Sequence, residues 1–141
     1  MQDLHPRIKE VLAQGFLMSL GTVDEGGPWV SDVGYVHDDE LNLYWISRKN
    51  RRHSFALRKN PSVAASITVS MPPEKDLGLQ IEGRAEELPE TPDIAQAYWA
   101  KRAEPPKRPM TSEHAWYRLK PTKIELIDEA NFAHEKKVLE I

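Results

Sequence analysis

Two stretches of strict two-residue alternation constrain the fold of this chain more than any other feature of its sequence. In one, the apolar residues from Val63 to Val69 alternate with small residues, and in the other, those from Leu77 to Ala85 alternate with mostly polar ones. Successive side chains of a strand point to opposite faces, so each stretch predicts a β-strand with one buried and one exposed face. We therefore expect a sheet that covers a core on one side.

Three further strands are expected before these two, and one after them. They cover residues 16–23, 28–36, 41–47 and 116–127. The turns that separate the first three are short and rich in Asp, Glu and Gly, which is typical of antiparallel neighbours. The last strand is expected to be interrupted at Pro121, because proline cannot donate a backbone hydrogen bond to its neighbour.

The rest of the chain predicts short helices and irregular segments. Helices are expected over residues 4–12, 51–59 and 91–102, a loop over 103–109, and a helical turn or frayed end over 135–141. Six mostly antiparallel strands with short helices indicate a mainly β protein, built as a small closed barrel. At 141 residues we expect a single domain, 1–141.

Composition excludes some kinds of site and points to another. The chain has no cysteine, so thiolate metal sites, disulfides and thiol catalysis are excluded. It has no apolar run as long as a membrane span, and we expect it in the cytoplasm. The net charge is only −3, yet residues 41–73 hold six cations and no carboxylate, which leaves −9 on the rest. A local cationic segment on an acidic chain favours a small anion over a nucleic acid.

The start of the helix expected over residues 51–59 is the best candidate for an anion site. A helix N-terminus has unpaired N–H groups and a positive dipole end, so Arg51, Arg52 and His53 oppose the dipole there. A bound phosphate would resolve that conflict, because arginine gives it charge-assisted hydrogen bonds. The alternative is a solvated basic loop, which is the more usual role of a charge run.

This segment also carries a resemblance to a known family. Residues 50–61 read Asn-Arg-Arg-His-Ser-Phe-Ala-Leu-Arg-Lys-Asn-Pro and follow an aromatic strand that ends in Ile46-Ser47. With the Gly-Gly-Pro turn at 26–28, the strand at 81–85 and the Trp-Tyr-Arg-Leu-Lys-Pro run at 116–121, this order resembles the FMN-binding split-barrel proteins of the pyridoxamine 5′-phosphate oxidase-like family. The resemblance runs from Phe16 to about Ile127.

The resemblance implies a six-stranded split β-barrel that forms a homodimer, with one FMN in each of two clefts at the subunit interface. Arg51, Arg52 and His53 occupy the places of the family's Ser-Arg-Lys motif, and Arg52 and His53 would hold the phosphate of FMN. Ile46 and Ser47 would line the edge of the isoalloxazine ring.

The remaining positions implied by the resemblance lie on other strands. Those expected to face the ring or the ribityl chain are Ser31, Asp32 and Val33. Gln80 would offer its amide to the flavin, while Trp116 and Arg118 would reach the cofactor from the second subunit. For the other tryptophans, Trp29, Trp45 and Trp99, packing is the expected role.

The chain departs from the family pattern in three ways. His53 replaces the usual lysine, which would make the phosphate contact weaker and dependent on pH near neutrality. Ser31 stands where the true oxidases carry an arginine, and their C-terminal Arg-x-His pair is here Arg118-Leu119-Lys120. These departures count against pyridoxamine 5′-phosphate as the substrate.

The functional hypotheses follow from these residues. The first is an FMN-dependent oxidoreductase of unknown substrate, for which no catalytic residue declares itself. The second is a module that binds a flavin, a deazaflavin or haem without turnover, and the third is binding of single-stranded nucleic acid by the basic segment. No metal site is expected, because ligand spacing is absent among His5, His37, His114 and His134.

Overall fold

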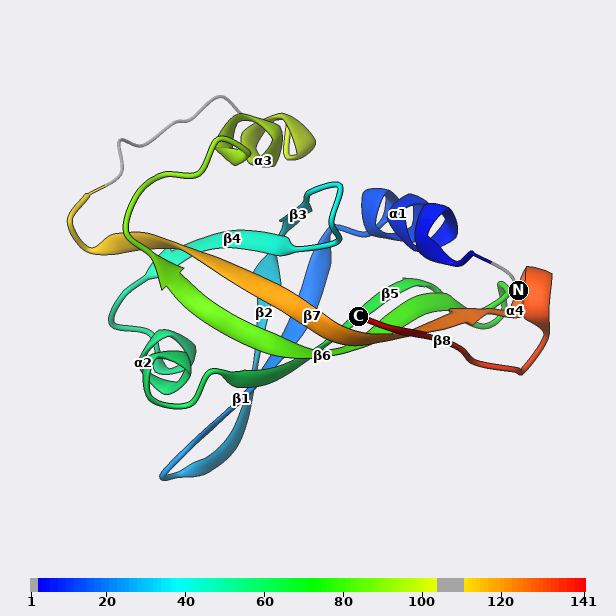
Figure 1. The fold of residues 1–141 in the computed structure, drawn as a ribbon, viewed down its shortest axis with the longest axis horizontal. Helices are drawn as coiled ribbons and strands as arrows, with labels where there is room; N and C mark the ends of the chain where they lie inside the picture. Colours follow the sequence, from blue (N-terminus) through cyan, green and yellow to red (C-terminus); the bar gives the residue numbers. More distant parts are fainter. Residues whose placement is uncertain (1–2, 104–110) are drawn as a thin grey trace.

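The fold is a single antiparallel sheet that curls into a half-barrel (Figure 1). The computed structural model describes residues 3–103 and 111–141. Along the sheet the strand order is β2-β1-β5-β6-β7-β4-β3, and β8 pairs with β7 beside this path. The strands are β1 (Leu17–Asp24), β2 (Gly27–Gly34), β3 (Val36–His37), β4 (Leu43–Arg48), β5 (Ser62–Ser70), β6 (Leu77–Leu88), β7 (His114–Asp128) and β8 (Lys137–Glu140).

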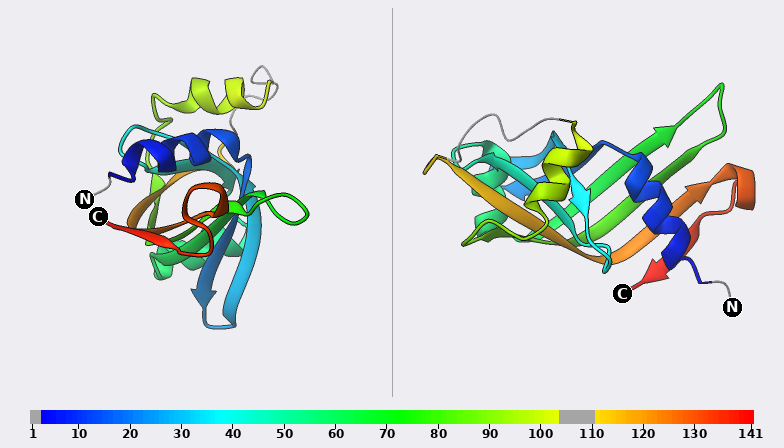
Figure 2. Two further views of the ribbon diagram at one scale, coloured as in Figure 1. Left: turned by 90° about the vertical axis from the view of Figure 1, so that its right-hand side faces the viewer. Right: turned by 90° about the horizontal axis from the view of Figure 1, so that it is seen from above.

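In the part of the chain that the structure describes, four short helices lie around this sheet. They are α1 (His5–Gln14), α2 (Arg52–Lys59), α3 (Ala95–Lys101) and α4 (Glu129–Phe132). Helices α1 and α3 lie on the same side of the molecule, whereas α2 lies near the β1–β2 hairpin (Figures 1 and 2). The helix expected from Thr91 begins later, at Ala95, because a turn closed by the Ala95 N–H and the Pro92 carbonyl precedes it.

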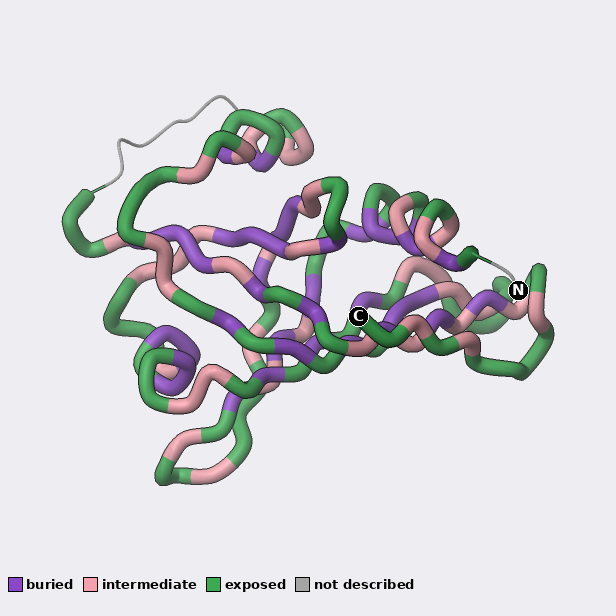
Figure 3. Tube along the Cα trace, viewed as in Figure 1, coloured by how far each residue is buried: buried purple, intermediate pink, exposed green. Residues whose placement is uncertain are grey.

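The two alternating stretches form the centre of the sheet, as the sequence predicts. Strands β5 and β6 bury every second residue (Figure 3), and Ala65 and Ile81 are opposite partners on the buried face. That face meets Ile8 and Leu12 of α1 in one continuous core. Burial of these apolar side chains is the main driving force that holds the half-barrel together.

The predicted number of strands is wrong at two places. The single strand expected over residues 28–36 divides into β2 and β3 around Tyr35. The charged tail, expected as a helical turn or frayed end, forms strand β8, and its Lys137–Glu140 backbone pairs with residues 123–126 of β7. Periodicity over four residues is too short to separate a strand from a turn.

The expected interruption at Pro121 is also wrong, because β7 runs through it. The register with β6 shifts there: Gly83 faces Pro121 and Glu82 faces Lys123, which leaves Thr122 as an extra residue. A bulge absorbs a proline without ending the strand, because the proline does not have to donate to the ladder. The loop expected over 103–109 lies almost entirely outside the described residues.

Candidate functional site

The two ends of the sheet approach each other where β2 and β4 make contact. Among the described residues, β2 pairs only with β1, and β4 pairs with β3 only at Tyr44 and Leu43. Residues 46–48 of β4 therefore have one backbone edge without a partner in this part of the chain. A cavity of about 440 Å³ opens at this split. Its lining residues are Asp32, Val33, Gly34, Ile46, Ser47, Arg48, Arg51, His53, Trp99 and His114.

The start of α2 forms one end of this cavity. Arg51 is the N-cap residue, and no side chain of residues 3–103 or 111–141 caps the helix. The backbone N–H groups of the first turn therefore remain available, and the dipole favours an anion beside them. Ser54 Oγ donates to the Arg48 carbonyl over 2.8 Å, which ties this turn to the end of β4.

His53 is the buried polar group of this end. Its side chain is 7 % exposed, and its Nε2 lies 3.0 Å from Ser47 Oγ. Burial, followed by the positive charge of Arg51, lowers the pKa of His53 below its ordinary value of 6.5. The imidazole is therefore neutral at pH 7 when no anion is bound.

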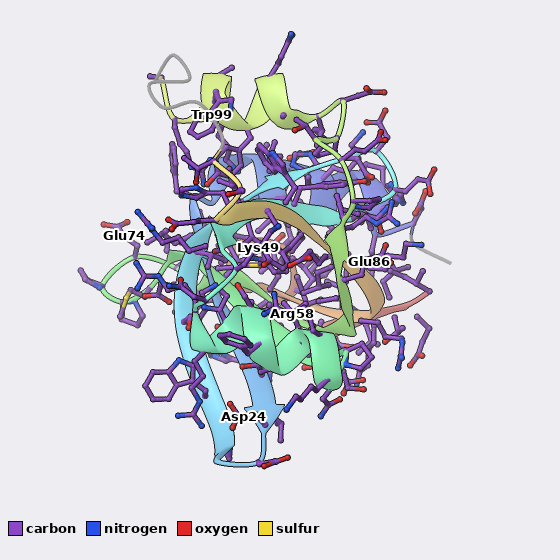
Figure 4. The ribbon with its side chains drawn as sticks, turned by 90° about the vertical axis from the view of Figure 1, so that its left-hand side faces the viewer. Asp24, Lys49, Arg58, Glu74, Glu86 and Trp99 are labelled. Carbon is purple, nitrogen blue, oxygen red and sulfur yellow. The ribbon has the colours of Figure 1, made fainter. Side chains whose placement is uncertain are left out.

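Arg52 takes a different direction from Arg51 and His53. Its guanidinium forms two hydrogen bonds to the Asp24 carboxylate, 2.9 and 3.0 Å long, and lies over the Trp29 ring at 4.4 Å. Figure 4 shows Asp24 in the β1–β2 hairpin below α2, on the side away from Trp99. Arg52 lines a second pocket between that hairpin and α2, so the structure separates it from the cavity.

The opposite wall of the cavity comes from β2 and α3. Asp32 accepts a hydrogen bond of 2.7 Å from Ser19 Oγ, and Val33 is buried beside it. Gly34 leaves room for Arg102, the C-cap residue of α3, because a Cβ at Gly34 would overlap the guanidinium. Arg102 donates to the Phe16 and Tyr35 carbonyls and so fastens α3 across this end of the sheet.

Besides Gly34 and Arg48, which were not predicted as site residues either, two lining residues were not predicted from the sequence. Trp99 was expected to have a packing role, but besides packing edge-on against Tyr98 and Trp116 it lines the cavity. His114, whose Nδ1 is 2.9 Å from Thr111 Oγ1, follows a segment without periodicity. No local pattern marks either residue, since α3 and β7 meet β4 only in the folded chain.

Besides Arg52, four of the residues implied by the resemblance do not line the cavity of this chain. Ser31 faces the side of β2 shared with Leu20, and Gln80 lies on the outer face of the sheet and accepts a hydrogen bond from Lys136. Arg118 donates to Glu86. Trp116 is only 2 % exposed and packs between Tyr98 and Trp99, so it cannot reach a group held by another subunit unless this cluster opens.

The comparison with known families decides the relationship of this chain. A sequence profile described as pyridoxamine 5′-phosphate oxidase matches residues 4–128. The chain belongs to the pyridoxamine 5′-phosphate oxidase family. The family match spans every element that lines the cavity. The chain is also 30 % identical to a UPF0306 protein of Pasteurella multocida over 87 residues, which are 60 % of this chain and only 58 % of that protein.

Solved structures share the fold of this pyridoxamine 5′-phosphate oxidase family member. A candidate pyridoxamine 5′-phosphate oxidase from Listeria innocua superimposes with a TM-score of 0.76 at 21 % identity, over 89 % of this chain and 98 % of that one. A haem-binding protein from Mycobacterium smegmatis gives 0.74 at 16 %, over 99 % and 59 %. An F420 reductase gives 0.68 at 21 %, over 82 % and 94 %.

Within 3–103 and 111–141, no three His, Asp or Glu side chains gather closely enough to hold a metal ion. None of the helices in those ranges has the length and apolar character needed to cross a membrane.

Proposed function

We propose that this protein binds FMN in the cavity between β2 and β4 and acts as a flavin-dependent oxidoreductase. The observation that carries the proposal is the cationic end of the cavity, where Arg51 and the uncapped start of α2 lie beside Ser47 and His53. These are the donors that a phosphate monoester takes. Within the described residues, Asp32 is the only carboxylate in the lining, and it comes from the β2 wall.

The rest of the cavity fits a flavin ring. A volume of about 440 Å³ lies in the usual range for small-molecule sites. The unpaired backbone edge at Ile46 to Arg48 offers donors and acceptors to the polar edge of the ring, while Val33 and Trp99 supply apolar surface. The residues present therefore fit the cofactor that the family implies.

The protein residues would bind and orient the flavin, which supplies hydride or electron transfer when bound. Arg51, Ser47 and His53 would anchor the phosphate, and Trp99 and Val33 would exclude water from the ring. We assign no catalytic acid or base, because the substrate that would need one is unknown.

A homodimer is part of the proposal. Gln80 and Arg118 lie outside the cavity of their own chain, so a role for either at the flavin requires a second copy. The outer face of the sheet supports such contact: Val30 is 65 % exposed beside a hollow of about 510 Å³. Small side chains on β1 and β5, such as Ser19 and Ala64, let a second subunit approach closely. Light scattering measures the mass of the assembly directly.

Haem is the second candidate occupant. Two imidazoles, His53 and His114, line the cavity, and imidazole is a common haem ligand. The structural neighbours include a haem-binding protein and an F420 reductase, so proteins of this fold are named for different cofactors. The absorption spectrum of the protein after titration with FMN, haem or a deazaflavin distinguishes these occupants.

Quenching of FMN fluorescence on titration with protein tests the proposal. We expect Arg51→Ala to weaken FMN binding by about 10- to 100-fold, because it removes a charge-assisted hydrogen bond to phosphate. The matched control is Lys49→Ala, which removes the same charge two residues away from an exposed side chain that does not line the cavity. Equal losses in the two variants, or no FMN binding by the wild type, would refute the proposal.

A further inference from the structure

The phosphate end of the cavity contains a buried histidine whose neighbours do not stabilise its charge. At the start of α2, the positive charge of the N-cap residue Arg51 acts on His53. Strand β4 contributes Ser47 and Arg48 to the cavity, and the Arg48 guanidinium is paired with Glu113 over 2.9 Å. His114 of β7 and Asp32 of β2 complete the titratable lining. In the described part of the chain, no carboxylate is hydrogen-bonded to His53.

Because of the contact between His53 and Ser47, the hydrogen-bond donors available to a ligand depend on whether His53 is protonated. When His53 is neutral and accepts at Nε2, the single hydroxyl proton of Ser47 is used in that bond. When the imidazole is protonated, Nε2 donates to Ser47 Oγ, and the hydroxyl proton is free to point at a ligand. Protonation thus adds a positive charge and releases a donor at the same place.

A phosphate monoester next to these groups reverses the balance that keeps His53 neutral. Its negative charge opposes the effects of burial and of Arg51 on the imidazole. We propose that the binding of a phosphate monoester in this cavity is coupled to the uptake of one proton by His53. The inference rests on the proposed function, since FMN is the ligand that brings the phosphate. The proton comes from solvent, and no other bond forms or breaks.

The direction of the pH dependence follows from this coupling. The ligand-free protein has a neutral His53 and the complex a charged one, so the affinity falls as pH rises through the range where only the complex holds the proton. The second ionisation of the phosphate, near pH 6, opposes this trend below neutrality and must be separated from it. Riboflavin has no phosphate and is expected to bind with little dependence on pH.

The test compares the wild type with His53→Lys and His53→Gln in FMN titrations from pH 5.5 to 8.5. The lysine carries a positive charge throughout this range and the glutamine none, so both variants report the titration of the phosphate alone. We expect the FMN affinity of the wild type to approach that of His53→Lys at pH 5.5 and that of His53→Gln at pH 8.5. Relative to either variant, the wild-type affinity should change by about tenfold across this range.

A measurement on the wild type alone covers the case in which a variant fails to fold. The heat of FMN binding, measured at one pH in buffers of different ionisation enthalpy, gives the number of protons taken up. An uptake that approaches one proton near pH 7 supports the inference. Three parallel affinity curves, or FMN binding without proton uptake, would overturn it and leave the proposed function intact. No FMN binding at any pH would overturn both.

Discussion

The two sides of the first turn of α2 carry similar charges in different surroundings. On one side Arg52 is held by the Asp24 carboxylate and the Trp29 ring, so its positive charge is already compensated within the chain. On the other side Arg51 and His53 face the cavity, where burial and Arg51 keep His53 neutral. A cation in a basic segment is therefore available to a ligand only where no carboxylate of the same chain already pairs with it.

The largest expected difference between the two sides is in the FMN affinity of their alanine variants. Arg52→Ala should change the FMN affinity by less than about threefold, whereas Arg51→Ala should lower it by about 10- to 100-fold. The reason is that the Arg52 guanidinium is already engaged by Asp24. Fluorescence titration of both variants under one condition measures the contrast. If Arg52→Ala lowered the FMN affinity as much as Arg51→Ala, the two sides of the first turn of α2 would not differ in phosphate binding.

A smaller effect is expected in the stability of the ligand-free protein near neutral pH. Because burial lowers the pKa of His53 from its ordinary value of 6.5, the unfolded chain binds a proton at this residue more readily than the folded one. The free energy of unfolding should therefore fall as pH drops through about 6.5. Urea unfolding at pH 7.5 and 5.5 measures this. The control is His53→Gln, whose free energy of unfolding should fall less between the two pH values. Saturating FMN should reduce the fall, because the bound phosphate stabilises the charged imidazole.

The smallest effect is expected on the Arg52 side, in a more acidic range. The hydrogen bond from Arg52 lowers the pKa of Asp24 below its ordinary value of 3.8. This carboxylate therefore adds stability above that value, and the contribution is lost as pH falls below it through the folded-state pKa. Asp24→Asn should be modestly less stable than the wild type at pH 7 and approach it at pH 3. Urea unfolding at both pH values checks this, and an equal difference at both would contradict the pairing.

Much of the sheet was predictable from local pattern. The alternation over Val63–Val69 and Leu77–Ala85 requires strands with one buried face, and β5 and β6 have that pattern in the folded chain. Short polar turns favoured antiparallel neighbours, and the start of a helix after Asn50 was predicted to within a residue. These features depend on residues close in sequence, so a single chain segment carries enough information to predict them.

The composition of the site was decided by tertiary contacts. In sequence, Arg51, Arg52 and His53 are one basic run. Successive residues of a helix point about 100° apart, so the three side chains cannot all face the cavity. Arg52 instead pairs with the Asp24 carboxylate of the β1–β2 hairpin. Trp99 reaches the cavity because Arg102 fastens α3 over Gly34. The sequence by itself determined most of the strands and a cationic helix start. Only the tertiary structure decided which of those cations face the cavity and which pair with a carboxylate, because the partners come from segments distant in sequence.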